Sequence, residues 1–113
     1  MGVAEQLGID TQRLQDRVVI RLAGELDMAS APQLRSAIEE LDLAQCPLLV
    51  LDLQELAFID STGLRVILWA HERCRQHAHT LALTPGSQQV QRLLAISGAG
   101  ERLRIVSSAD EAV

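Results

Sequence analysis

The chain has 113 residues and a net charge of −5, and 48% of its residues are apolar while 2% are aromatic. This length fits a single domain, residues 1–113, and the apolar share is enough to form a core. Because the charge is negative, binding to nucleic acid or to an anionic membrane would have to overcome electrostatic repulsion. Nucleic acid is therefore excluded as an expected partner, and a protein with a basic face is favoured.

The cysteines and the apolar segments predict where the protein resides. Cys46 and Cys74 do not form a C-x-x-C motif, and two isolated cysteines are typical of reduced thiols in the cytosol. No stretch combines a basic start with the apolar run of a signal peptide. The most apolar run, residues 48–53, is too short to span a bilayer. We therefore expect a cytoplasmic protein that does not bind membranes directly.

The N-terminal part of the chain predicts a β-hairpin preceded by a loose lead-in over residues 1–10. A first strand is expected near residues 11–15, followed by a turn at Asp16-Arg17. The β-branched run at residues 18–22 predicts the second strand. Gly24-Glu25-Leu26-Asp27 is then expected to form a connecting loop.

A helix and a buried strand are predicted next. Ser30 stands where a helix N-cap is expected, and Gln33, three residues later, completes a capping box. Cys46-Pro47 ends the helical segment. The continuous apolar run at residues 48–51 is typical of a central strand covered on both faces. The apolar stripe of the helix consists of residues at positions i, i+3, i+4 and i+7, namely Leu34, Ala37, Ile38 and Leu41.

Helices and strands continue to alternate in the second half of the chain. Strands are predicted at residues 81–83 and 103–106, with a helix capped by Ser87 between them. Ser108 and Glu111 have capping-box spacing, which predicts a helical tail. Because alternating strands and helices imply right-handed crossovers, the predicted fold class is α/β with a largely parallel sheet. Two apolar helical stripes support this prediction, Leu64, Ile67, Leu68 and His71 in one and Val90, Leu93 and Leu94 in the other.

Asp60-Ser61-Thr62-Gly63 is the stretch that most suggests a functional site. It places a carboxylate and two hydroxyls between a predicted strand and the helix that follows. Ligands of open α/β sheets bind at such carboxyl ends of strands. Helix capping is the alternative, because Asp, Ser and Thr side chains all satisfy free N–H groups at a helix start. The residues alone leave both alternatives open.

The sequence contains no complete motif for catalysis, metal binding or cofactor binding. Ser61 has no G-x-S-x-G elbow, and His71 falls on an apolar helical stripe, where packing is the expected role. Asp60 and Gly63 are one residue too far apart for the aspartic-protease pattern. His77 and His79 have no second cluster with zinc-ligand spacing. No glycine-rich phosphate-binding motif occurs. We therefore expect no catalytic residue, metal or cofactor.

Two motifs taken together resemble a known family. Gly24-Glu25-Leu26-Asp27, followed by Phe58-Ile59-Asp60-Ser61-Thr62-Gly63-Leu64, resembles the STAS domain of bacterial anti-sigma-factor antagonists. The resemblance extends from the strand at residue 18 to the strand at residue 103. It implies a mixed, largely parallel sheet with an N-terminal hairpin, packed against amphipathic helices. One departure is Ser97-Gly98-Ala99, where the family often has a leucine after the glycine.

The resemblance also implies a function. An anti-sigma factor with serine kinase activity would bind the protein and release a sigma factor, and phosphorylation of Ser61 would end that binding until a phosphoserine phosphatase resets it. Asp27 has an alternative role as a simple turn residue. Rival functions are an accessory subunit of a lipid-transport ABC complex, a module of another signalling assembly, or a small hydrolase using Ser61. The expected partner-binding residues are Glu25, Asp27, Asp60, Ser61, Thr62 and Gly63.

Overall fold

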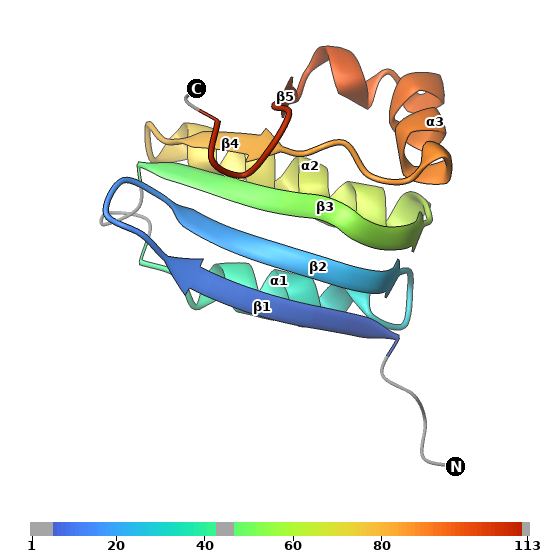
Figure 1. Cartoon of the computed structure of the whole chain (residues 1–113), viewed down its shortest axis with the longest axis horizontal. Helices are drawn as coiled ribbons and strands as arrows, with labels where there is room; N and C mark the ends of the chain where they lie inside the picture. Colours follow the sequence, from blue (N-terminus) through green and yellow to red (C-terminus); the bar gives the residue numbers. More distant parts are fainter. Residues whose placement is uncertain (1–5, 43–46, 112–113) are drawn as a thin grey trace.

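The computed structural model describes residues 6–42 and 47–111, and over these residues it shows one mixed sheet with helices packed on it (Figure 1). The strands lie in the order β1-β2-β3-β4-β5. β1 is antiparallel to β2, and the remaining neighbours are parallel. This arrangement confirms the predicted fold class and the N-terminal hairpin. The elements are β1 (Leu7–Arg13), β2 (Val18–Leu26), α1 (Ala31–Glu39), β3 (Leu48–Ile59), α2 (Ser61–Gln76), β4 (Thr80–Leu83), α3 (Gln88–Ser97), the 3₁₀ helix η2 (Ala99–Glu101) and β5 (Arg104–Ile105).

The hairpin starts earlier and its second strand runs further than the sequence predicted. β1 begins at Leu7, which is buried, so the expected lead-in is wrong from that residue onward. β2 continues to Leu26, so the loop predicted for residues 24–27 is wrong except at Asp27. The register with β3 shifts between Gly24 and Glu25, where β3 has one extra residue, Ala57, and Gly24 itself has a φ of +98°, which favours glycine. Beyond this shift, Glu25 and Leu26 continue pairing with Phe58 and Ile59 of β3.

Helix α1 is capped differently from the prediction. Ser30 occupies the N-cap position, but its backbone is helical and its hydroxyl donates to the Glu25 carbonyl at 2.8 Å. The Gln33 N–H bonds to the backbone oxygen of Ser30 instead of its side chain. The expected capping box is therefore wrong. The apolar stripe is confirmed, since Leu34 and Ile38 are fully buried. Cys46 lies outside the described residues.

Helices α1 and α2 lie together on one face of the sheet, where the main core forms (Figure 1). β3 runs through the middle of the sheet, and its predicted segment, residues 48–51, is confirmed as strand. Leu49 and Leu51 contribute to the core on the helical face, while Val50 belongs to a smaller cluster on the other face. The predicted strand at residues 81–83 and the cap of α3 by Ser87 are also confirmed.

The C-terminal tail covers part of the second face of the sheet and is not helical over its described residues. Val106 and Ala109 pack against apolar residues of β2, β3 and β4. The Glu111 carboxylate accepts a hydrogen bond from the Ser107 N–H at 2.9 Å, which lowers the pKa of Glu111. The residues between them form turns, so the predicted helical tail is wrong. A turn replaces it, in which the Glu111 N–H also donates to the Ser108 carbonyl at 3.1 Å.

Arg17 fastens this tail to the hairpin. Its Nη1 donates to the carbonyl oxygens of Ala109 at 2.9 Å and Glu111 at 2.8 Å, and its side chain is 9% exposed. The guanidinium also bonds to the neighbouring Asp16 carboxylate, which lowers the pKa of Asp16 and raises that of Arg17. A residue adjacent to the hairpin turn thereby holds a segment more than ninety residues away in sequence.

Replacing Arg17 with methionine is expected to lower the free energy of unfolding by about 1–3 kcal/mol, because tail carbonyls lose their charged donor. Urea unfolding followed by circular dichroism measures the change. Asp16→Asn is the matched control and should unfold near the wild-type midpoint, since this carboxylate is 69% exposed. An Arg17→Met protein as stable as the wild type would contradict the fastening role.

Candidate functional site

The candidate site lies where the carboxyl ends of β2 and β3 meet. Leu26 and Ile59 are paired at the ends of these parallel strands, and each is followed by an aspartate, Asp27 and Asp60. The Asp60 N–H donates to the Leu26 carbonyl at 3.1 Å and joins the two segments. The sheet therefore brings together two motifs that are more than thirty residues apart.

Asp60 organises the start of α2. Its backbone is extended, and its Oδ1 accepts a hydrogen bond from the Gly63 N–H at 2.9 Å, as an N-cap residue does. Its Oδ2 accepts a second hydrogen bond from the Met28 N–H at 3.1 Å. One carboxylate thus links the first turn of α2 to the loop before α1. Asp60 therefore stabilises the conformation of the site and also contributes one of its negative charges.

Asp27 plays a similar role in the neighbouring loop. Its Oδ1 accepts hydrogen bonds from the Ala29 N–H at 3.0 Å and the Ser30 N–H at 3.2 Å. Asp27, which the sequence placed at the partner surface or in a turn, therefore forms the turn that leads into α1. Glu25, by contrast, is exposed at the end of β2.

Ser61 and Thr62 are the hydroxyl residues of the site, and neither caps the helix. Ser61 is the first residue of α2 and is exposed, while Thr62 is half-buried. Among the residues that the structure describes, no hydrogen bond to the Ser61 hydroxyl is found. Because Asp60 supplies the cap, the Ser61 hydroxyl is available to an outside group.

Gly63 lets α2 start close to β2. A Cβ at this position would lie 2.7 Å from both the backbone oxygen and the Cγ of Leu26, and 3.0 Å from Cγ1 of Ile59. Contacts below 3.0 Å to backbone require the backbone to shift. The glycine of the motif is therefore needed for packing of the helix against the sheet.

The enzymatic alternatives find no support in the geometry. His71 is on the same helix as Ser61 and ten residues later, which places it about 15 Å further along the axis. It is half-buried, as the packing prediction requires, and its Nδ1 has no hydrogen-bond partner in the described part of the chain. His77 is the C-cap of α2, and its Nδ1 lies 2.9 Å from the Arg73 carbonyl. No group of residues suited to a metal ion is found among residues 6–42 and 47–111.

Three residues near the site were not assigned a role there from the sequence, although Phe58 begins the second motif. Met28 is 74% exposed beside Asp60, and Phe58 is 39% exposed at the end of β3. Gln89 of α3 bonds both backbone groups of Ile59, with Nε2 donating at 2.8 Å and Oε1 accepting at 2.9 Å. The position of Met28 directly after the motif aspartate was a usable signal. Nothing in the sequence indicated Gln89, because its contact joins residues thirty apart.

Asp60→Ala is expected to lower the free energy of unfolding by about 1–2 kcal/mol, because the Gly63 and Met28 N–H groups both lose their acceptor. Asp60→Asn should cost less, since the amide oxygen can still accept from Gly63 while the NH₂ group cannot accept from Met28. Chemical denaturation of both variants measures the order. Equal losses for the two substitutions would mean that the hydrogen bond from the Gly63 N–H contributes nothing.

Comparison with known proteins agrees with this geometry. The STAS domain family matches residues 8–112. An anti-sigma-B factor antagonist of Listeria monocytogenes is 34% identical over 94 residues, which cover 83% of this chain and 82% of the relative. An anti-sigma F factor antagonist of Paenibacillus polymyxa is also 34% identical, over 81% of this chain and 80% of the relative. These relatives are regulatory binding proteins rather than enzymes.

Solved structures show the same fold. An anti-sigma factor antagonist from Mycobacterium paratuberculosis superposes with a TM-score of 0.84 at 21% identity, over 97% of this chain and 93% of that one. The unphosphorylated form of the anti-sigma factor antagonist SpoIIAA superposes with a TM-score of 0.75 at 24% identity, over 88% of each chain. A solved structure of SpoIIAA in its phosphorylated form also matches, with a TM-score of 0.69. The chain is a small domain of the α/β class, and it belongs to the STAS domain family.

No helix within residues 6–42 and 47–111 has the length and apolar character required to cross a membrane.

Proposed function

We propose that this chain is an anti-sigma-factor antagonist. It binds an anti-sigma factor through the Ser61 surface, and the anti-sigma factor then releases its sigma factor for transcription. The support is the 34% identity to antagonists over most of both chains, together with the exposed loop and helix start described above. The Ser61 surface comprises Glu25, Asp27, Asp60, Ser61 and Thr62, and the buried Gly63, also expected at this site, supports it from within the fold.

The observation that carries the proposal is that Asp60 and Ser61 have different roles: Asp60 stabilises the loop, and Ser61 presents an unused hydroxyl. Both Asp60 oxygens accept hydrogen bonds from backbone N–H groups, so the loop is held in place before any partner arrives. Ser61 stands exposed beside it at the first position of α2. A preformed loop with an unused hydroxyl suits a surface that a partner both binds and modifies.

Phosphorylation of Ser61 switches the antagonist off in this proposal. A phosphate adds roughly −1.5 to −2 charges at pH 7, and the start of a helix stabilises such charge by about 0.3–1 kcal/mol. The fold therefore tolerates the modification. The phosphate adds to the negative charges of Asp60 and Asp27, and an interface built for a neutral hydroxyl then faces unpaired charge. The cost is several kcal/mol and falls on binding.

The partners follow from this mechanism. The anti-sigma factor acts as the serine kinase and uses ATP, while the chain itself carries no cofactor. A phosphoserine phosphatase returns the protein to its binding form. All of these reactions belong in the cytoplasm, where the transcription machinery operates.

The proposal is tested by incubating the purified protein with ATP and the serine-kinase anti-sigma factor of its source organism. Phosphopeptide mapping should locate the phosphate on Ser61, and Thr62→Val should incorporate phosphate at close to the normal level. An interaction with ABC-transporter subunits in place of an anti-sigma factor, with no phosphate on Ser61, would contradict the proposal.

A further inference from the structure

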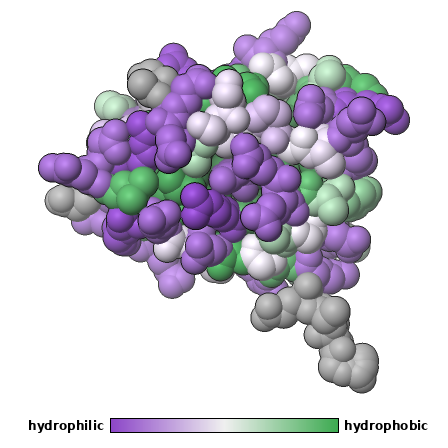
Figure 2. Space-filling view, viewed as in Figure 1, coloured by the Kyte–Doolittle hydropathy of each residue, from purple (hydrophilic) through white to green (hydrophobic). Residues whose placement is uncertain are grey.

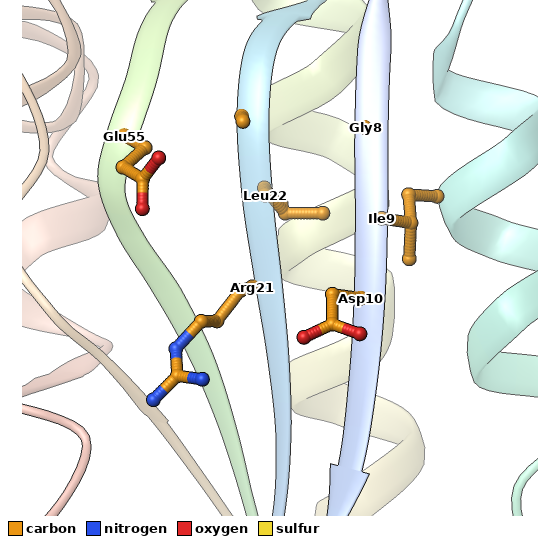
Figure 3. Close-up of a pocket in the computed structure, with 7 residues that line it drawn as sticks. Gly8, Ile9, Asp10, Arg21, Leu22 and Glu55 are labelled. Carbon is orange, nitrogen blue, oxygen red and sulfur yellow. The ribbon is translucent and has the colours of Figure 1, made fainter.

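A hollow of about 300 Å³ lies on the face of the sheet opposite α1 and α2, over β1, β2 and β3 (Figure 3). Gly8 and Ala23 are paired across β1 and β2. Neither has a side chain larger than a methyl group, so little projects from the sheet at this point and a hollow remains. The surrounding face presents mainly hydrophilic residues (Figure 2). The C-terminal tail covers other residues of this face, such as Val19 and Val50, and the hollow is open to solvent on one side.

Charged side chains surround the hollow. Asp10 extends from β1 and Glu55 from β3, so that the two carboxylates stand on either side of β2 (Figure 3). Arg21 also lines it, but its Nε bonds the Asp52 carboxylate at 3.3 Å and its Nη1 lies 3.5 Å from Gln12 Oε1. Within the described residues, Asp10 and Glu55 have no hydrogen-bond or ion-pair partner. The basic group is thus already paired, and the two acidic groups are not.

This combination matches one kind of occupant. The side chains of arginine and lysine have an apolar stem and a cationic end, and the stem commonly lies along apolar surface while the charge stays in water. Here the stem would lie over Gly8 and Ala23, and the cationic end would meet Asp10 and Glu55. We propose that the hollow binds a single arginine or lysine side chain of a protein partner.

A side chain presented by a protein fits better than a free small cation. The hollow is open on one side, and exposed ion pairs are worth only about 0.2–1 kcal/mol each. Such contacts hold an isolated cation or a short peptide only weakly, and they add to an interface whose other contacts already position the basic residue. The hollow lies on the open sheet face and shares no residue with the Ser61 surface, so the inference does not depend on the proposed function.

The test is NMR titration of the ¹⁵N-labelled protein with a capped Gly-Arg-Gly peptide, using a capped Gly-citrulline-Gly peptide as the uncharged control of the same shape. Saturable shifts should centre on the amides of Gly8, Ala23 and Glu55. The affinity for the citrulline peptide should be at least about fivefold lower than that for the arginine peptide. High salt should weaken the arginine peptide's binding further.

Four variants complete the experiment. Asp10→Asn and Glu55→Gln should each weaken binding about twofold to fivefold. Gly8→Val should abolish it by filling the floor, and it should still fold because a Cβ at Gly8 meets its nearest neighbours at 3.9 Å. Glu101→Gln, an exposed carboxylate away from the hollow, is the matched control and should bind normally.

Three results would overturn the inference. The first is equal binding of the arginine and citrulline peptides, and the second is shifts scattered over the acidic surface that the variants do not change. The third is spermidine binding at the hollow much more tightly than the peptide, which would identify a small-molecule site instead. Thermal melting of each variant confirms that its binding is measured on folded protein.

Discussion

Phosphorylation of Ser61 is expected to weaken binding to the anti-sigma factor by more than about a hundredfold, while the melting temperature stays near that of the unmodified protein. A loss of about 3 kcal/mol in binding free energy corresponds to slightly more than this factor. The fold is spared because the phosphate stands at the start of α2, where backbone N–H groups and the helix dipole favour negative charge. Ser61 is also exposed, so no packing is lost.

Two substitutions at Ser61 separate the loss of the phosphorylation site from the effect of negative charge on partner binding. Ser61→Ala retains a small neutral group and should bind the partner normally, but it can no longer be switched off. Ser61→Asp adds one negative charge, which is less than a phosphate carries, so its affinity should fall between those of the unmodified and phosphorylated proteins. Both variants should melt near the wild-type temperature.

Titration calorimetry against the anti-sigma factor measures these affinities. Thr62→Val is the control for the neighbouring hydroxyl and should retain both binding and its loss after phosphorylation. If Ser61→Asp and Ser61→Ala bound equally well and the phosphate mapped to another residue, Ser61 would not be the switch.

Gly63→Ala is expected to lower the free energy of unfolding by about 1–3 kcal/mol, which is the usual cost of overpacking a tight contact. The added Cβ would lie 2.7 Å from the Leu26 backbone oxygen, and backbone cannot move aside as a flexible side chain can. The first turn of α2 would have to shift away from β2. Since Asp60 caps that turn through the Gly63 N–H, the same shift should distort the Ser61 surface and weaken partner binding.

Gly100→Ala is the matched control for this substitution. A Cβ there would meet its nearest atom, the Leu94 backbone oxygen, at 3.7 Å, which is ordinary van der Waals contact. Its unfolding midpoint and partner affinity should be close to those of the wild type. Chemical denaturation and calorimetry of the pair provide the comparison, and a Gly63→Ala protein as stable as Gly100→Ala would show that α2 can start further from the sheet at no cost.

Features that depend on neighbouring residues were predictable from the sequence. The apolar spacing of Leu34 and Ile38 placed α1, and the run at residues 48–51 placed β3 in the centre of the sheet. Ser87 was correctly identified as the cap of α3 because its acceptor and the Val90 N–H are three residues apart. These signals are local, so an isolated segment already contains them.

The candidate site was partly predictable for the same reason. Asp60-Ser61-Thr62-Gly63 could be placed between a strand and a helix, because a strand pattern precedes it and a helical stripe follows. The sequence could not decide which of its polar side chains caps the helix. The Asp60 cap is local, since Asp60 and Gly63 are three residues apart, but the second hydrogen bond to Asp60 comes from the Met28 N–H, in a loop more than thirty residues earlier.

The sequence by itself therefore determined the class of the fold, the order of most elements and the position of Ser61 at a strand-to-helix junction. Only the tertiary structure decided that residues 24–26 are strand, because that requires pairing with the end of β3 across a shift in register after Gly24. It also decided that the tail lies over the sheet, held by Arg17, instead of forming a helix. Both outcomes depend on contacts between residues far apart in the sequence. Local conformational propensity does not indicate which distant residues will come into contact.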